Sequence, residues 1–505
     1  MRKSWMILGV GIATLGAADR FQFERVTAQT QSAPTSQSLT VLDLHRIEEA
    51  YHLTDVLGDG LWPGFDLRKR PIAINNRNVE EVLIGHPNPP PEFHLCEGQS
   101  VGGKPVFRRD GYTLYAPRWG GGSVEIAGTE CAYVGVKWDA PTEDYLLVLL
   151  HEGFHGFQQE YRERSEGPTE EPPQDDAEYS ALLALESRIL YQILMTENDE
   201  AAAGLARMFI AVRRTRWRLL GEAVISDEAE WEYREGTATY IQVRAVQLLS
   251  AKGGFKPLYP DEDRDYRAFA TAPERYREQL EDIRIALGSP ISFDYGMYVL
   301  GMAQGLVLDR FRPSWKREIA ERDCTQFDLM ERAFKVAEGQ RDSLVSEAKA
   351  RFQYDILLAD QTGQMEKQKA AIRGYLETKG RRYRIFHDEL PGGHKWKPVA
   401  PVYRLRDKII WVGGVRRFEK GPMVFESQNV PIIFDWHAIE WVDTNPDPSG
   451  KDLRISCTGM RGDVYEGLVV ETDGFRLELP SALVEVTKEL VTIRPVPFAP
   501  QTAHD

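Results

Sequence analysis

The chain has 505 residues, of which 42% are hydrophobic and 28% are charged. This composition is typical of a soluble globular protein, and the length leaves room for two or three domains. The net charge of −15 and the lack of a basic stripe with interleaved aromatic residues argue against a nucleic-acid-binding protein. We therefore expect no nucleic-acid partner.

The first 28 residues predict a signal peptide. The positive start MRKSW precedes the apolar run MILGVGIATLGAA, and small residues permit cleavage after Ala18 or Ala28. The run is shorter than the roughly 20 residues that span a membrane, and no neighbouring cysteine could carry a lipid. We expect an exported protein, periplasmic or extracellular, with no stable membrane span after cleavage and with a polar leader at residues 29–38.

Residues 39–140 predict a small α+β portion. A helix is expected over Leu42–Leu57, followed by strand-like runs with Gly/Pro-rich connections. These runs are Pro71–Ile74, Glu81–Ile84, Tyr112–Tyr115 and Cys131–Lys137. The last run could bind an extended peptide by adding a strand at an exposed edge. Cys96 and Cys131 could form a disulfide in an oxidising compartment, a question that the sequence leaves open.

The stretch YLLVLLHEGFHGFQQEY predicts a buried helix with a metal-binding motif. Before it, Thr142 is the expected N-cap, followed by acids in the first turn. Residues four apart lie on one face of a helix, so His151 and His155 can both point at one metal ion. Glu152 can then reach a water molecule at the ion. This is the HExxH arrangement of zinc hydrolases, in which the glutamate is the general base.

Helical patterns dominate from Asp176 to about Gly380, and strand-like patterns follow. The expected helices are 177–196, 199–219, 226–250, 263–287, 294–311, 314–322, 326–338 and 341–378. From residue 381 onward, short β-branched and aromatic runs separated by Gly, Pro, Asn and Asp predict an all-β domain, as a sandwich or a small barrel. The sequence assigns no chemistry to this domain.

A catalytic zinc ion usually takes three protein ligands, so the two histidines need a third partner. No histidine stands six residues after His155, where the chain has Tyr161. The segment EWEYREGTATYIQV offers the best candidate, Glu235. The small residues after it would let its helix pack closely enough for a glutamate to reach the ion. Glu232 is the alternative ligand.

HEGFH followed about eighty residues later by EGTATY resembles the gluzincin class of zinc metallopeptidases, which combine HExxH with a glutamate on a following helix. The chain is also similar to exported bacterial proteins of unassigned substrate, which share stretches like Trp62–Asp66 and Tyr298–Asp309. The resemblance covers about residues 60–320. It implies an α+β fold in which residues 141–380 form a mainly helical, zincin-like catalytic domain, between the small N-terminal portion and the β-rich domain at 381–505.

The same resemblance implies a mechanism. Zinc held by the two histidines and Glu235 activates a water molecule, and Glu152 accepts the proton and passes it to the leaving amine. A further donor should hold the developing oxyanion. Tyr298, Tyr295 and Tyr240 are the candidates, with Tyr298 ahead because it begins the downstream helical motif.

One position departs from the pattern of these relatives. They commonly carry an acid four residues after the third ligand, where this chain has Thr239. Because outer carboxylates orient metal-binding histidines, another group must do so here, and Glu178 and Glu186 are candidates. Glu186 lies in an otherwise apolar helix, so a buried ion pair with Arg213 or Arg214 is the alternative.

These features predict an exported zinc-dependent hydrolase, most simply a peptidase acting on a peptide or protein. A hydrolase of a different amide or ester is one alternative. An inactive metallopeptidase scaffold that serves as a binding protein of the cell envelope is another. The intact histidines and Glu152 argue against the inactive scaffold. Cleavage specificity and oligomeric state stay open.

Overall fold

The computed structural model describes residues 38–496 apart from several interior segments. These segments are 77–78, 112–120, 137–140, 161, 163–172, 174–175, 267–292, 388–389, 391–393, 399–401, 406–407, 412–414, 421, 428–431, 436, 444–452, 473–474 and 488–489. The predicted signal peptide, the strand expected at Tyr112–Tyr115 and most of the helix expected at 263–287 lie outside the described residues. Helices and sheets both build the molecule, so the predicted α+β class is confirmed.

The chain divides into two compact units. The first contains the described residues up to 172 and residues 182–354, and the second contains residues 173–181 and the described residues from 355 onward. No helix within the described ranges is long and apolar enough to cross a membrane. All four cysteines are free, so Cys96 and Cys131 are not joined by a disulfide in this structure.

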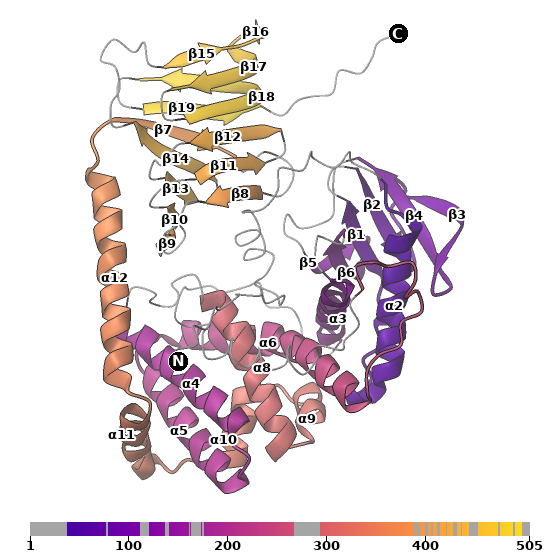
Figure 1. Cartoon of the computed structure of the whole chain (residues 1–505), viewed down its shortest axis with the longest axis vertical. Coiled ribbons are helices and arrows are strands. Elements are labelled where there is room, and N and C mark those ends of the chain that lie inside the picture. The colour runs from indigo at the N-terminus through magenta and orange to yellow at the C-terminus, as the bar shows by residue number, and fades with distance from the viewer. Residues whose placement is uncertain are drawn as a thin grey trace, which may run out of the picture. The chain divides into compact units, whose positions relative to one another are not determined.

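A six-stranded sheet forms the N-terminal part of the first unit (Figure 1). Its strands are β1 (Ile72–Asn76), β2 (Glu80–Ile84), β3 (His94–Val101), β4 (Lys104–Asp110), β5 (Gly121–Ile126) and β6 (Thr129–Gly135), in the order β3-β4-β2-β1-β6-β5. The expectation that the strand at Cys131–Lys137 has an exposed edge is wrong. β6 is that strand, and it pairs with β1 on one side and with β5 on the other.

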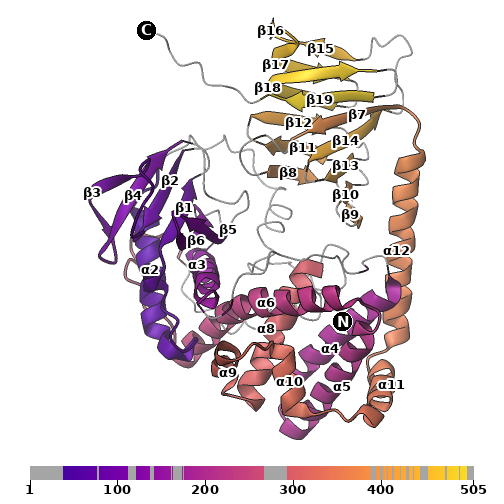
Figure 2. The ribbon, with the colours of Figure 1, turned by 180° about the vertical axis from the view of Figure 1, so that it is seen from behind.

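Helices make up most of the rest of the first unit, although residues 177–181, at the start of one of them, belong to the second unit (Figure 2). They are α2 (Val41–Leu57), α3 (Thr142–Gln158), α4 (Ala177–Met195), α5 (Asp199–Trp217), α6 (Glu222–Ala251), α8 (Phe293–Phe311), α9 (Trp315–Glu321), α10 (Gln326–Phe334) and α11 (Arg341–Arg351). α3 packs along β5, β6 and α2, and α6 packs against both α3 and α8. The helix expected over 341–378 is two helices, because Gln353 takes a positive φ of 54° between them.

The loop that contains Trp62 and Phe65 packs on the metal-motif helix. The Trp62 and Phe154 rings meet edge to face at 4.9 Å, and the Phe65 and Phe154 rings meet at 5.3 Å. Gly153 lies beneath Leu67 of the same loop, and a Cβ on Gly153 would overlap the Leu67 side chain. A side chain at position 153 would therefore displace the end of the Leu67 side chain, so the glycine inside HEGFH leaves room for Leu67 to pack on α3.

α6 and α8 cross in backbone contact. A Cβ on Gly236 would overlap the backbone of Gly301, and a Cβ on Gly301 would overlap the backbone carbonyl of Glu232. The sequence predicted that the small residues after Glu235 let α6 pack closely against the metal-motif helix. Gly236 instead lies at the α6–α8 crossing, where the absence of a side chain lets α8 approach.

A buried charge network joins α4, α5 and α6. Arg213 donates to Glu186 at 2.9 Å and to both carboxylate oxygens of Glu232 at 2.5 and 2.6 Å. Arg216 donates to Glu186 at 2.6 Å and to Glu228 at 2.7 Å. The expected ion pair between Glu186 and Arg213 is thus confirmed. Removing one member would leave a buried charge uncompensated, which is strongly destabilising.

The second unit consists mainly of α12 (Tyr354–Glu377) and a 13-stranded sheet. Its strands are β7 (Arg381–Phe386), β8 (His394–Pro398), β9 (Val402–Leu405), β10 (Lys408–Trp411), β11 (Val415–Lys420), β12 (Met423–Ser427), β13 (Ile432–Asp435), β14 (Ala438–Asp443), β15 (Arg454–Ser456), β16 (Gly459–Arg461), β17 (Val464–Glu471), β18 (Phe475–Val486) and β19 (Leu490–Pro495). Among the described residues after Gly380 the regular elements are strands, so the predicted β-rich region is confirmed. The long strand β18 pairs with β12, β17 and β19, so the strands form one continuous sheet.

Candidate metal centre

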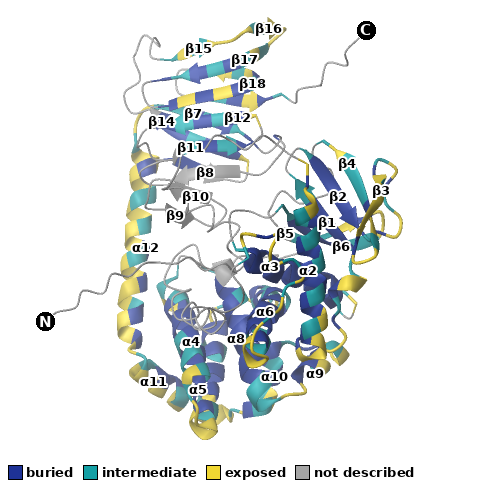
Figure 3. Cartoon of the chain, turned by 45° about the vertical axis from the view of Figure 1, so that its right-hand side comes forward, coloured by how far each residue is buried: buried dark blue, intermediate teal, exposed yellow. Residues whose placement is uncertain are grey.

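The metal-motif helix α3 is buried along almost its whole length (Figure 3). It begins at Thr142 with Glu143 and Asp144 in its first turn. The expectation that Thr142 caps this helix is wrong: Pro141 occupies the N-cap, and the Thr142 hydroxyl donates to Asp263 at 2.7 Å. α6 is held against α3 by a hydrogen bond of 3.1 Å from the Gln242 side chain to the Leu147 carbonyl.

Three side chains converge where α3 and α6 meet. The Nε2 atoms of His151 and His155 lie 2.9 Å apart, and Oε2 of Glu235 lies 3.3 Å from the first and 3.2 Å from the second. All three residues are buried, with exposed fractions of 1%, 6% and 5%. They form a group that could hold a metal ion. Glu232, the alternative ligand, is instead bound to Arg213 and Gln304.

The electrostatics of the group follow from its burial. Burial, together with the neighbouring His155, lowers the pKa of His151 to about 4. For His155, the Glu235 carboxylate outweighs burial and raises the pKa. Burial alone would raise the pKa of Glu235, but His155 and the hydrogen bonds from both imidazoles hold it well below its ordinary range. Glu152 is also buried beside them, and burial raises its pKa to about 8.

The sequence analysis missed the side chain that orients His155. Gln158 donates from its amide nitrogen to the Thr237 hydroxyl at 2.6 Å and to the Arg234 carbonyl at 2.9 Å. Its amide oxygen therefore faces the Nδ1 atom of His155, at 2.9 Å. With a metal ion bound, Nδ1–H would donate to that oxygen and the Nε2 lone pair would point into the group. The spacing of three residues between His155 and Gln158 was the available signal.

The carboxylates expected to orient the histidines do not do so. Glu186 belongs to the buried charge network, and Glu178 is exposed. The Thr239 hydroxyl donates to the Glu235 backbone carbonyl at 2.8 Å, within its own helix. Nδ1 of His151 is buried and has no hydrogen-bond partner among the described residues. α6 thus provides the Glu235 carboxylate and, through its contacts with Gln158, supports the orientation of His155.

Of the three tyrosine candidates, the structure brings Tyr298 to the group. Its ring stacks on that of His151, with centroids 6.2 Å apart and planes 3° from parallel. Burial raises the pKa of Tyr298 well above its ordinary value, and the carboxylates of Glu235 and Glu152 add to this rise. The Tyr240 hydroxyl donates to Asp309 at 2.6 Å and is occupied there. The side chain of Tyr295 lies outside the described residues.

Arg234 is a second neighbour that the sequence analysis missed. Its Nε and Nη2 atoms lie 3.2 and 3.1 Å from Oε1 of Glu235. This carboxylate oxygen is the one that does not face the imidazoles, so Arg234 holds Glu235 from the other side. The guanidinium also acts electrostatically on Glu152 and Tyr298. The sequence does not predict that Arg234 contacts the carboxylate of Glu235, because this contact depends on side-chain directions on α6.

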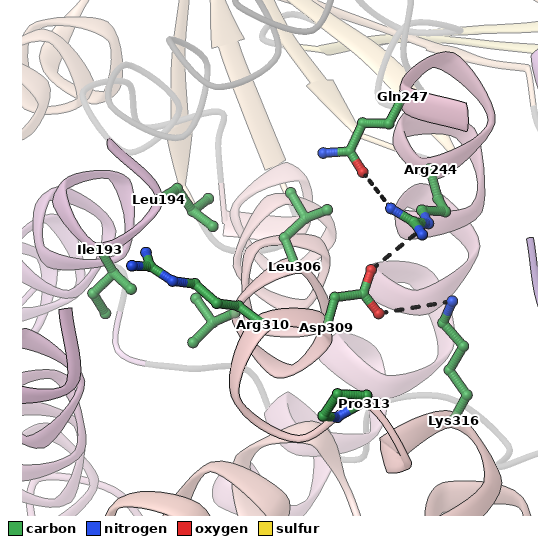
Figure 4. A pocket seen from close by; sticks show the side chains of 10 residues that line it. Ile193, Leu194, Arg244, Gln247, Leu306, Asp309, Arg310, Pro313 and Lys316 are labelled. Atoms are coloured by element: carbon green, nitrogen blue, oxygen red, sulfur yellow. Dashed lines mark hydrogen bonds and ion pairs between the residues drawn. The ribbon is translucent and has the colours of Figure 1, made fainter. Parts of the chain in front are cut away.

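A cavity of about 460 Å³ lies elsewhere in the first unit, and none of its lining residues belongs to the metal group (Figure 4). Asp309 stands at its centre, between Arg244 at 3.8 Å and Lys316 at 3.7 Å. Its carboxylate also accepts hydrogen bonds from Tyr240 and from Trp315, the latter at 2.8 Å. These charged groups compensate one another, which explains why Tyr240 is directed here and not to the metal group.

Comparisons with protein-family models, with curated proteins and with solved structures give no match to this chain.

Proposed function

We propose that this protein is a zinc-dependent hydrolase that cleaves peptide bonds, and that it acts outside the cytoplasm, as its N-terminal sequence suggests. The observation that carries the proposal is the buried triangle of His151, His155 and Glu235 with Glu152 beside it. Two imidazoles and one carboxylate on packed helices are the ligand set of zinc peptidases with an open coordination position. A zincin-like domain is part of this proposal.

The triangle is close to the size of a zinc site and slightly smaller. Zinc binds imidazole nitrogen and carboxylate oxygen at about 2.0–2.2 Å with tetrahedral angles. Ligand atoms in such a site are about 3.3–3.6 Å apart, and the three separations here are 2.9, 3.2 and 3.3 Å. Ferrous oxygenases use a similar ligand set. The buried carboxyl group of Glu152 next to the triangle favours hydrolysis over oxygen chemistry, because hydrolysis needs a base at this place.

The chain's own residues supply the rest of the chemistry. His151, His155 and Glu235 would hold the zinc ion, whose Lewis acidity makes water a nucleophile near neutral pH. We expect Glu152 to accept the proton of the attacking water and to return it to the leaving amine. The ring of Tyr298 stacks on His151, and we expect its phenol to donate a hydrogen bond to the oxyanion that develops on the substrate.

β5 offers a place for an extended substrate. It ends the six-stranded sheet as far as the described strands extend, so one of its edges faces no described strand. It also lies beside the metal-motif helix, and Gln159 after that helix donates to Ser123 of β5 at 3.2 Å. A peptide that adds to this edge would gain main-chain hydrogen bonds independent of its sequence. β5 thus takes the role that the sequence analysis gave to β6.

The test compares wild type with Glu152→Gln on a peptide library, with the metal content of both proteins measured. We expect about one zinc per chain in both, and a turnover in Glu152→Gln at least 100-fold below wild type, because a positioned base contributes about 10²–10⁴-fold. Zinc binding without peptide cleavage by wild type would contradict peptidase activity. Equal turnover by both proteins would exclude Glu152 as the base.

A further inference from the structure

Three partly exposed side chains border the buried metal group: Trp231, Arg234 and Tyr298. Trp231 and Arg234 are three residues apart on α6 and share a face of that helix. Tyr298 on α8 lies between Trp231 and His151, with ring centroids 6.3 Å from the first and 6.2 Å from the second. Two aromatic rings and one cation are thus the partly exposed groups nearest the metal group that these contacts identify.

Arg234 uses only part of its hydrogen-bonding capacity within the protein. Nε and Nη2 both face a single oxygen, Oε1 of Glu235. The other N–H groups of the guanidinium have no acceptor among the described residues, and the side chain is 33% exposed. The nearby carboxylate of Glu230 is paired with Arg162 at 3.0 Å and does not occupy Arg234. Part of the Arg234 guanidinium is thus exposed and has no partner among the described residues, beside the Glu235 ligand.

We propose that Arg234 binds a carboxylate of the substrate next to the scissile bond. The planar guanidinium matches a carboxylate with two parallel hydrogen bonds, and these charge-assisted bonds are stronger than neutral ones. The rings of Trp231 and Tyr298 give the adjoining part of the substrate an apolar surface. This assignment rests on the proposed function and names its substrate class: peptides with an anionic group at that position.

Two sources offer this chemistry, the free C-terminal carboxylate of a peptide and the side chain of an aspartate or glutamate. The ligands that separate them are N-acetyl-Phe-Phe with a free carboxylate, its C-terminal amide, and N-acetyl-Phe-Asp-amide. Binding of each is measured by calorimetry on the zinc-loaded, full-length Glu152→Gln protein. The assay needs no turnover, so it gives an answer even if no peptide is cleaved.

We expect at least one carboxylate ligand to bind tenfold or more tightly than the amide. The preference should disappear when Arg234→Gln is added, and should survive in part with Arg234→Lys, which keeps the charge but loses the planar fork. Arg244→Gln is the matched control: Arg244 lies on the same helix, is 30% exposed and faces Asp309. Its replacement should leave the preference unchanged.

A purely positioning role for Arg234 gives a different result. In that case Arg234→Gln would weaken zinc binding, measured by competition with a chelator, and the ratio of carboxylate to amide affinity would not change. That outcome, or equal binding of all three peptides in the presence of Arg234, overturns the proposal. A preference that Arg234→Gln abolishes supports it, and the better of the two carboxylate ligands identifies the source.

Discussion

The imidazole of His155 is held by Gln158, the last residue of its own helix α3. Gln158 in turn bonds to Thr237 and to the Arg234 carbonyl of α6, the helix that also carries Glu235. The orientation of His155 therefore depends on how α3 and α6 pack. Such outer partners determine the tautomer of a metal-binding histidine and its affinity for the ion.

Replacing Gln158 tests whether this side chain holds His155 in its metal-binding orientation. We expect Gln158→Ala to weaken zinc binding by about 10–100-fold, because His155 loses the acceptor that holds its Nδ1–H. Chelator competition on the folded protein measures the change. Gln159→Ala is the matched control, since Gln159 bonds to Ser123 and Glu130 and not to a ligand. Equal zinc affinity of Gln158→Ala and wild type would show that Gln158 does not hold His155.

The three ligand residues could be predicted from the sequence, because the spacing of the two histidines is local. His151 and His155 need only the pitch of one helix to share a face, and Glu235 stood out within its segment. The roles of the neighbours were not predicted: the spacing of Gln158 from His155 permits a contact but does not determine the direction of its amide, and Arg234 contacts the carboxylate of the residue beside it. Their roles depend on side-chain directions that only the packing of two helices determines.

At the scale of elements, the crossing of α6 and α8 brings Tyr298 to the metal group. The two glycines at the crossing, Gly236 and Gly301, let the helix backbones touch. We expect Gly301→Ala to lower the free energy of unfolding by about 1–3 kcal/mol or more, because the new methyl group would overlap the Glu232 carbonyl. Denaturant unfolding of the zinc-loaded protein measures the loss.

Gly204→Ala in α5 is the control for this change. A Cβ at Gly204 meets no atom within 4 Å, so alanine should stabilise the helix by about 0.4–1 kcal/mol through the unfolded state. If the two substitutions had the same effect, the close approach at Gly301 would not determine the packing of α6 and α8.

Asp263 joins α2 to the start of α3, and this link should be sensitive to acid. Burial would raise the pKa of Asp263, but hydrogen bonds from Arg46 at 2.8 Å and Thr142 at 2.7 Å keep it below its ordinary value. A carboxyl group with a lower pKa in the folded state stabilises the fold above its unfolded pKa of about 3.9, and this contribution is lost as the pH falls through the folded value.

We therefore expect wild type to lose more unfolding free energy between pH 6 and pH 3 than Asp263→Asn does. At pH 6 the variant should be the less stable of the two, and the gap should narrow as the acid protonates Asp263. Urea unfolding at both pH values gives the comparison. A gap that stays constant with pH would mean that the Asp263 charge does not contribute.

The helices from α4 to α10 were predicted from the spacing of their apolar residues, with ends within a few residues of the structure except the start of α6 and the end of α10. β3, β4 and β5 were not predicted. Most β3 residues are exposed, so the strand lacks the apolar alternation that marks a half-buried strand. Its pairing with β4 is a tertiary feature that a local pattern does not contain.

At the scale of the molecule, all three residues of the metal group belong to the first unit. Zinc that binds only the folded form should stabilise this unit by about 4 kcal/mol at a thousandfold excess over the dissociation constant. We expect calorimetric unfolding to show two transitions, with zinc raising the temperature of one of them. The variant Glu235→Ala should remove this effect. A zinc shift in both transitions, or in neither, would contradict the location of the site.

The division into a helical region and a later β region was predicted from the sequence. Near Gly380 the helical spacing of apolar residues gives way to short β-branched and aromatic runs. The arrangement of the 13 strands was not visible, because β18 changes partners along its length and short strands pair across long separations in sequence. The pairing and register of these strands depend on contacts between segments that are distant in the sequence.

The most direct test is anomalous diffraction at the zinc absorption edge from crystals of the zinc-loaded protein. The account predicts a strong anomalous peak, at full occupancy, about 2.0–2.2 Å from Nε2 of His151, Nε2 of His155 and the Glu235 carboxylate. The peak should vanish in crystals of Glu235→Ala grown with the same zinc concentration. The absence of a peak between these three side chains in the wild-type protein would contradict the central claim.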